Sequence, residues 1–197
     1  LLAQRDREAA KVLSTEDWKR QREKVRHTLA DIVGPFPERT PLNARIVSTV
    51  EKADYRIENI VFESQPGFYV TSALFLPKNL SSPAPAVLYA SGHALSGYRS
   101  GYIPIILNLV KKGFVVFAWD PISQGERLQY LSDDGKPVIG GNNAEHAYMT
   151  QQAMLTDSSL ARYVIWDGIR AADYLLTRPE VDPKRVGMTG RSGGGFQ

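Results

Sequence analysis

Hydrophobic and polar positions follow different patterns along the chain, and each pattern predicts an element. Residues 1 to about 33 are predicted to be helical in two pieces, with Ser14 or Thr15 as the N-cap of the second piece. That piece ends at the first glycine and proline of 34–44, a stretch too rich in proline for regular structure. We therefore expect a helical extension and a connector before the main body of the fold.

Two segments of alternating apolar and polar residues, 55–63 and 68–76, follow the connector. Alternation with a period of two is typical of a strand that buries one face. The Ser-Gln-Pro-Gly stretch at 64–67 supplies turn residues between the two segments. The pattern therefore predicts an antiparallel β-hairpin.

Short apolar runs further along the chain predict three buried strands, at 86–90, 114–119 and 185–190. A helix is predicted at 102–112, between the first two runs, and a helical stripe begins at Asp157 and ends at Pro179. An excursion at 121–156, with a turn at 132–135, precedes that stripe. Strands that alternate with helices indicate a parallel sheet, so the predicted fold class is α/β.

Composition and charge narrow the class of protein. Apolar residues make up 43% of the 197 residues and charged residues 23%, which excludes disorder, collagen and coiled coil as descriptions of the whole chain. No uncharged apolar run reaches about 18 residues, so membrane insertion is not expected. The absence of cysteine excludes disulfides and thiolate metal sites. The net charge is +3, and the basic residues at 19–26 lie near acidic ones, as on a solvated helix face, so no nucleic-acid partner is predicted.

A serine set among glycines carries the strongest chemical signal. Residues 190–194 read Gly-Arg-Ser-Gly-Gly and fit the pattern G-x-S-x-G directly after a predicted strand. Such a strand-to-helix turn is strained, and glycine on both sides of the serine avoids a collision of side chains. Ser192 is therefore predicted to be a nucleophile, with the backbone N–H of Gly193 as an oxyanion donor. The alternative is a glycine-rich turn with an incidental serine. A phosphate loop is disfavoured, because its spaced glycines and lysine are absent.

Three stretches carry a family resemblance. Residues 175–197 resemble the approach to the nucleophile in α/β-hydrolases of the acetyl xylan esterase and dienelactone hydrolase type. Residues 120–127 (DPISQGER) resemble the aspartate-and-glycine loop after the fourth strand of those esterases, and residues 91–97 (SGHALSG) resemble their oxyanion loop. The stretches keep the family's order, and the hairpin at 55–76 matches its first two strands.

The resemblance implies an α/β-hydrolase fold and a division of the chain. Residues 1–44 would form an N-terminal helical extension and connector, and residues 45–197 the N-terminal part of the catalytic domain, ending just after the nucleophile elbow. Backbone N–H groups of His93 and Ala94 in the oxyanion loop would act with that of Gly193. This loop carries Gly-His where many members carry His-Gly, which leaves open which N–H enters the hole.

A serine esterase also needs a general base, and in this fold the acid and the histidine follow the nucleophile. Neither follows Ser192 here, so we expect residues 1–197 to be a segment of a longer polypeptide, without esterase turnover on its own. Such a segment would leave its third strand with an uncovered edge. His27 is predicted to face solvent, and His146 to be a surface residue that could reach a substrate, while His93 belongs to the oxyanion loop. No pair of histidines has metal-ligand spacing, so no metal and no cofactor are expected.

Other side chains near these loops have less specific interpretations. Asp120 precedes a proline at the end of a strand and is predicted to anchor its loop rather than to act as the triad acid. Glu126 and Arg127 are predicted to form an ion pair or a loop brace. The aromatic residues that could line a pocket are Tyr98, Tyr102, Trp119 and Tyr130, although Trp119 is expected in the core.

These observations predict a serine carboxylic-ester hydrolase that forms an acyl-enzyme on Ser192. The resemblance implies removal of acetyl groups from carbohydrate, a small-molecule or oligosaccharide ester as substrate, and an extracytoplasmic location. Two alternatives stay open: a non-catalytic binding module with an α/β-hydrolase-like fold, and a peptidase on the same fold. Nothing in the sequence indicates an oligomeric state.

Overall fold

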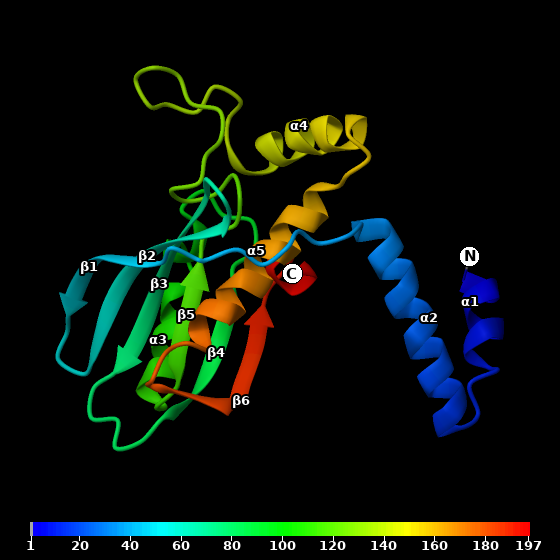
Figure 1. The fold of residues 1–197 in the computed structure, drawn as a ribbon, viewed down its shortest axis with the longest axis horizontal. Helices are drawn as coiled ribbons and strands as arrows, with labels where there is room; N and C mark the ends of the chain where they lie inside the picture. The colour runs from blue at the N-terminus through cyan, green and yellow to red at the C-terminus, as the bar shows by residue number, and fades with distance from the viewer. Residues whose placement is uncertain (1) are drawn as a thin grey trace. The chain divides into compact units, whose positions relative to one another are not determined.

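A computed structural model describes residues 2–197 of the chain (Figure 1). The chain divides into two compact units, Leu1–Phe36 and Pro37–Gln197, with the boundary inside the connector expected at 34–44. None of the helices in this described part of the chain is long and apolar enough to cross a membrane.

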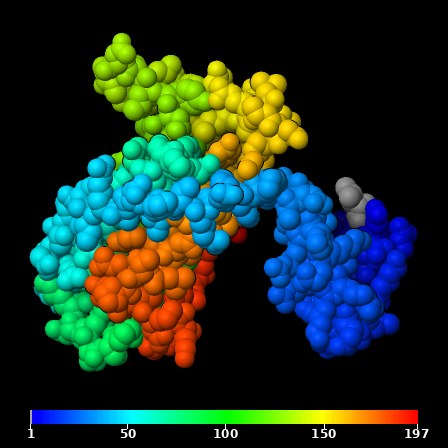
Figure 2. Space-filling view, in the orientation of Figure 1, coloured from blue at the N-terminus to red at the C-terminus, as the bar shows by residue number. Residues whose placement is uncertain are grey.

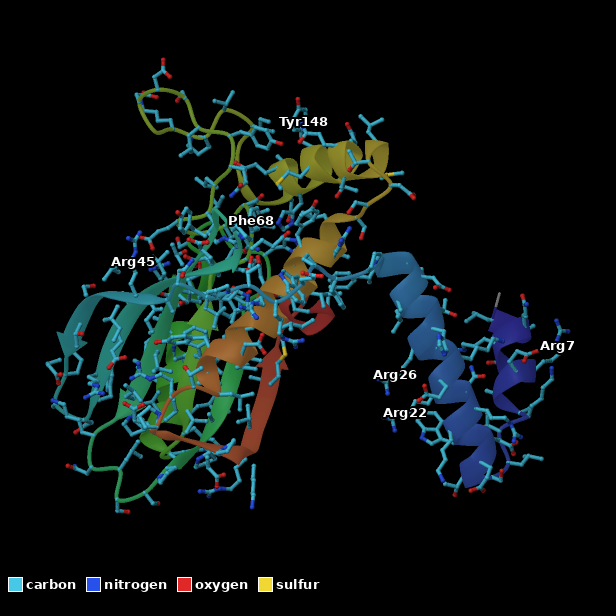
Figure 3. All side chains as sticks on the ribbon, in the orientation of Figure 1. Arg7, Arg22, Arg26, Arg45, Phe68 and Tyr148 are labelled. Carbon is cyan, nitrogen blue, oxygen red and sulfur yellow. The ribbon has the colours of Figure 1, made fainter. Side chains whose placement is uncertain are left out.

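The first unit consists of the two predicted helix pieces, α1 (Leu2–Ala9) and α2 (Thr15–Val33). The hydroxyl oxygen of Ser14 caps α2 by accepting a backbone N–H of the first turn at 3.1 Å. The predicted solvated face is confirmed, because Arg22 and Arg26 are exposed and project from the same side of α2 (Figure 3).

The second unit is built on a six-stranded sheet with the order β1-β2-β3-β5-β4-β6. The strands are β1 (Arg45–Glu51), β2 (Tyr55–Gln65), β3 (Phe68–Pro77), β4 (Ala84–Ala90), β5 (Val115–Trp119) and β6 (Val181–Gly190). β1, β2 and β3 are antiparallel neighbours, and β3 also runs antiparallel to β5, whereas β5, β4 and β6 are parallel. The predicted hairpin and the parallel arrangement of the three later strands are therefore confirmed.

The edge strand β6 differs from the prediction of a buried strand. Within residues 2–197 it pairs with β4 alone, and most of its residues are exposed. The uncovered edge expected from the sequence is confirmed, and exposure of β6 follows from it, because a strand at the edge of a sheet has a neighbour on one side only.

Helices cover both faces of the sheet. The helices of the second unit are η1 (Gly97–Arg99), α3 (Ile103–Lys111), α4 (Asn142–Leu155), α5 (Leu160–Leu175) and the short α6 (Gly193–Phe196), and of these α3 and α5 pack on opposite faces of the sheet. Successive strand residues point to opposite faces, so Leu74 belongs to one buried cluster with Leu175 of α5, and its neighbour Phe75 to another with Ile106 of α3. The strand ends and the loops between these layers position the candidate site.

Besides the short η1, two elements have no counterpart in the prediction. β1 has no buried residue, and α4, inside the excursion at 121–156, buries only Glu145, so neither element has an apolar face to identify it. The predicted turn at 132–135 is confirmed by a 2.8 Å hydrogen bond from the N–H of Gly135 to the carbonyl oxygen of Ser132. In the space-filling view, the loop that holds this turn and α4 project from the rest of the second unit (Figure 2).

Candidate active site

Ser192 lies in the turn between β6 and α6, with a φ of 55° and a ψ of −121°. Residues with a Cβ seldom occupy this region of backbone space, so neighbouring contacts must hold the turn in it. A Cβ on Gly190 would overlap the carbonyl oxygen of Gly194, and a Cβ on Gly194 would overlap that of Ala90. Backbone therefore packs directly on backbone around Ser192, which requires glycine at both positions.

Ser192 lines a cavity of about 520 Å³ in the second unit. Leu160 and Val164 of α5 and Phe196 of α6 make part of its wall apolar, and His93 and His146 bring imidazole nitrogens to it. A cavity of this size with apolar walls and a few polar atoms suits a small ligand.

Some of the backbone N–H groups near Ser192 have a hydrogen-bond acceptor and others do not. The N–H of Ala94 donates to the side-chain oxygen Oε1 of Gln124 at 2.6 Å, so it is already occupied. The N–H groups of His93 and Gly193 donate to no other group among residues 2–197. Of the two loop amides considered from the sequence, the structure thus leaves that of His93 free.

His93 and His146 are paired in the cavity wall. Nε2 of His93 lies 3.0 Å from Nδ1 of His146, and Nε2 of His146 lies 2.8 Å from the carbonyl oxygen of Ile122. A Cβ on Gly193 would come within 2.9 Å of Cε1 and Nδ1 of His93, so that edge of the ring faces Gly193. Partial desolvation of the ring and the neighbouring His146 lower the pKa of His93.

The sequence did not indicate this pair. The sequence predicts a surface residue that could reach a substrate; the structure places His146 half-buried in the cavity wall, where a substrate could reach it. The carboxylate of the adjacent Glu145 is buried and accepts the N–H groups of Gln129 at 3.0 Å and Tyr130 at 3.4 Å. Glu145 therefore joins the start of α4 to the preceding loop, beside the histidine. Among residues 2–197, no group of three or more side chains is arranged to hold a metal ion.

Asp120 anchors two loops, which confirms that interpretation. Its buried carboxylate accepts the hydroxyl of Thr71 at 2.9 Å and pairs with Arg99 at 2.6 Å. It also accepts the backbone N–H of Glu126 at 3.3 Å. Gly125 packs so closely on this carboxylate that a Cβ would overlap it, and its positive φ of 59° also favours glycine. Through these contacts Asp120 anchors the loops that carry Gln124 and η1.

Of the two interpretations of Glu126 and Arg127, the ion pair between them is wrong and the loop brace is confirmed. Glu126 pairs with Arg99 at 2.8 Å, whereas Arg127 pairs with Asp167 of α5 at 2.7 Å, with both side chains of that second pair buried. Adjacent residues in a tight loop point in different directions, so each reaches its own partner. Arg127 also lies over the ring of Phe68 at the start of β3, which is labelled in Figure 3.

Trp119 lies in the core as expected, and the three tyrosines that could line the pocket lie elsewhere. The side chains of Tyr98 and Trp119 are buried in the two hydrophobic clusters, and neither Tyr102 nor Tyr130 lines the cavity around Ser192. Tyr130 instead stacks edge to face with Tyr148 of α4. His27 is exposed on α2, as predicted.

With this geometry established, comparison with known proteins places the chain in a family. Residues 42–196 match the model of the acetyl xylan esterase family, a stretch that contains the whole sheet and the turn of Ser192. The chain belongs to the acetyl xylan esterase family. The α/β-hydrolase fold inferred from the sequence is confirmed by solved structures of the same architecture.

Individual relatives show how far the likeness extends. A candidate acetyl xylan esterase from Bacteroides fragilis NCTC 9343 has a TM-score of 0.76 at 19% identity, over 93% of this chain and 50% of its own. Acetyl xylan esterase 1 from Thermoanaerobacterium sp. JW/SL YS485 has a TM-score of 0.59 at 25% identity, over 86% of this chain and 56% of its own. The candidate hydrolase YtaP of Bacillus subtilis (strain 168) is 24% identical over 176 residues, which cover 87% of this chain and 56% of YtaP. The chain spans about half the length of these relatives.

Proposed function

We propose that Ser192 is the nucleophile of a carboxylic-ester hydrolase that removes acetyl groups from carbohydrate. The observation that carries the proposal is the strained turn of Ser192, which lines a cavity beside two unpaired backbone N–H groups. A nucleophile on a rigid turn beside preorganised donors is the arrangement that acyl transfer requires. The acetyl group and the carbohydrate are supported by the family and by the names of its esterases. An extracytoplasmic location is part of the same proposal.

In this mechanism, Oγ of Ser192 attacks the ester carbonyl and loses its proton to a histidine base. The carbonyl oxygen becomes an oxyanion that the N–H groups of Gly193 and His93 stabilise. The alcohol leaves with a proton, and water then attacks the acetyl-serine to release acetate. The chain order of the fold assigns the acid and the base to positions after the nucleophile, so neither His93 nor His146 takes the role of base.

Labelling with a fluorophosphonate probe tests the nucleophile in the full-length protein. We expect stoichiometric labelling of Ser192, and no labelling of the Ser192→Ala variant. Hydrolysis of p-nitrophenyl acetate should fall by at least about 10⁴-fold in that variant. Ser132→Ala, which alters a serine in the projecting loop, is the matched control and should keep both properties.

The two alternative functions predict different outcomes. A binding module would show neither labelling nor hydrolysis in the wild-type protein. A peptidase would cleave an aminoacyl anilide faster than p-nitrophenyl acetate, whereas an esterase shows the reverse order. Persistent labelling of Ser192→Ala would overturn the assignment of the nucleophile.

A further inference from the structure

The histidine pair determines which nitrogen of His93 carries a proton. A carbonyl oxygen only accepts hydrogen bonds, so Nε2 of His146, 2.8 Å from the oxygen of Ile122, must donate. In the neutral ring, Nδ1 of His146 is then an acceptor, and Nε2 of His93 at 3.0 Å must donate to it. Nδ1 of neutral His93 is consequently left with a lone pair and no hydrogen.

This lone pair lies close to the turn of Ser192. The Nδ1 edge of His93 faces Gly193, the residue that follows Ser192, and both His93 and Ser192 line the cavity. His93 is an exposed residue, and its Nδ1 has no hydrogen-bond partner among residues 2–197. An acceptor in that place can accept a hydrogen bond from a donor group in the cavity.

We propose that Nδ1 of His93 accepts a hydrogen bond from a free hydroxyl group that neighbours the scissile ester, and that His146 is the positioning residue that fixes the tautomer. The proposal rests on the proposed function and adds a substrate class: esters of polyols or sugars with an unesterified hydroxyl on the adjacent carbon. His93 then contributes twice, through its backbone N–H to the oxyanion and through its ring to the alcohol part of the substrate.

The chemistry of the lone pair favours a hydroxyl over other neighbours. A carbonyl or carboxylate oxygen in the same place has lone pairs and no hydrogen, so it would repel the lone pair of Nδ1. An alkyl group would leave a polar nitrogen without a partner while displacing the water that could bond to it. A hydroxyl donates, and so satisfies the nitrogen.

Two acetates that differ in one group test the proposal with the full-length protein. In 2-hydroxyethyl acetate a hydroxyl neighbours the ester, and propyl acetate carries a methyl group of similar size in its place. We expect kcat/KM to be about three- to tenfold higher for the hydroxylated ester, the gain typical of one hydrogen bond. A ratio near one in an enzyme that hydrolyses both esters through Ser192 would overturn this inference and leave the proposed function intact. Absence of any Ser192-dependent hydrolysis would overturn both.

Substitutions at the pair identify the residues responsible. His93→Phe keeps a ring but removes the acceptor, so the ratio should fall to about one. His146→Leu removes the acceptor for Nε2 of His93 and should have the same effect on the ratio. His146→Asn has nearly the shape of leucine but retains a side-chain oxygen, so it should restore most of the preference. Equal ratios in the Leu and Asn variants would overturn the role of His146.

Imidazole ¹⁵N NMR of the wild-type protein gives a readout that depends on no variant. We expect Nε2 of His93 to be protonated and Nδ1 to be bare at neutral pH. A proton on Nδ1 would overturn the proposal even if the ester ratio agreed with it. In His146→Leu the preference for this tautomer should disappear, whereas in His146→Asn it should remain.

Discussion

Arg127 and Asp167 form an ion pair of 2.7 Å in which the side chains are only 3% and 2% exposed. The guanidinium also donates to the carbonyl oxygen of Asp120 at 3.0 Å, and so it binds the loop after β5 to α5. Both that loop and α5 contribute residues to the cavity wall. The pair therefore holds two walls of the candidate site together.

Asp167→Ala should lower the free energy of unfolding by about 3–5 kcal/mol, because it leaves the guanidinium buried without its partner. Adding Arg127→Met should recover at least half of that loss, since the double variant has no unpaired charge. Urea denaturation of the full-length protein, followed by circular dichroism, measures both effects. A loss below about 1 kcal/mol in the single variant would contradict the role of the pair.

Gly193→Ala should disturb the histidine pair, because its Cβ would come within 2.9 Å of the His93 ring. The ring must move, so we expect kcat/KM for both acetates to fall by about tenfold and the preference for the hydroxylated ester to be lost. Gly195→Ala is the matched control: its Cβ would meet nothing closer than 3.7 Å, and activity should be retained. Equal effects of the two substitutions would contradict this explanation.

Gln124 should affect the rate of hydrolysis because its side chain holds the oxyanion loop at Ala94. Gln124→Leu leaves the N–H of Ala94 without an acceptor and should lower kcat by about tenfold, because the oxyanion loop loses a fixed contact. Gln124→Glu retains an acceptor oxygen at that position and should keep most of the activity. Steady-state kinetics with p-nitrophenyl acetate separates the two variants. The prediction fails if the Glu variant is impaired as much as the Leu variant.

The preference for an ester with a neighbouring hydroxyl should fall as the pH is lowered. A proton added to the histidine pair places a hydrogen on Nδ1 of His93, so the acceptor is present above the pKa of His93 and is lost below it. Partial desolvation of the His93 ring and the nearby His146 both hold that pKa below its ordinary value of 6.5. The preference should therefore be constant at neutral pH and decline only in more acidic solution.

The ratio of kcat/KM for 2-hydroxyethyl acetate and propyl acetate is the appropriate measurement. Protonation of the catalytic base affects both esters equally and cancels in the ratio. A preference that declines already above pH 6.5 would contradict the direction of the pKa shift.

The parts of the site that the sequence predicted are those marked by a short local pattern. The turn of Ser192 depends on glycines two positions away on either side, and a short pattern contains all of that information. The anchoring role of Asp120 could be predicted because a carboxylate at the end of a buried strand needs hydrogen-bond partners, although its partners Thr71 and Arg99 lie far away in the sequence. In both cases a local pattern marks the residue, while part of its packing comes from distant segments such as the strand of Ala90.

The remaining features depend on distant segments. His93 and His146 are 53 residues apart, and the helix that carries His146 has no apolar stripe to predict it. Arg127 pairs with a residue of α5 that is 40 positions away, although the acidic residue Glu126 is adjacent to Arg127 in the sequence. Edge strand β1 is missed for the same reason as α4. All of its residues are exposed, so no alternation of buried and exposed positions shapes its sequence.

Glu145, the one buried residue of α4, has a consequence for how selectivity can change. The turn of Ser192 is held by glycine backbone at the end of the sheet, whereas the start of the helix that carries His146 is joined to the preceding loop by Glu145, by the N–H of Asn142 and by Nε2 of His146. Ser192 and His146 therefore lie on segments with separate supports. Replacing α4, with Glu145 retained, should remove the proposed preference for a neighbouring hydroxyl while the acyl chemistry at Ser192 persists. The helix is in this sense a module that can be varied independently of the nucleophile.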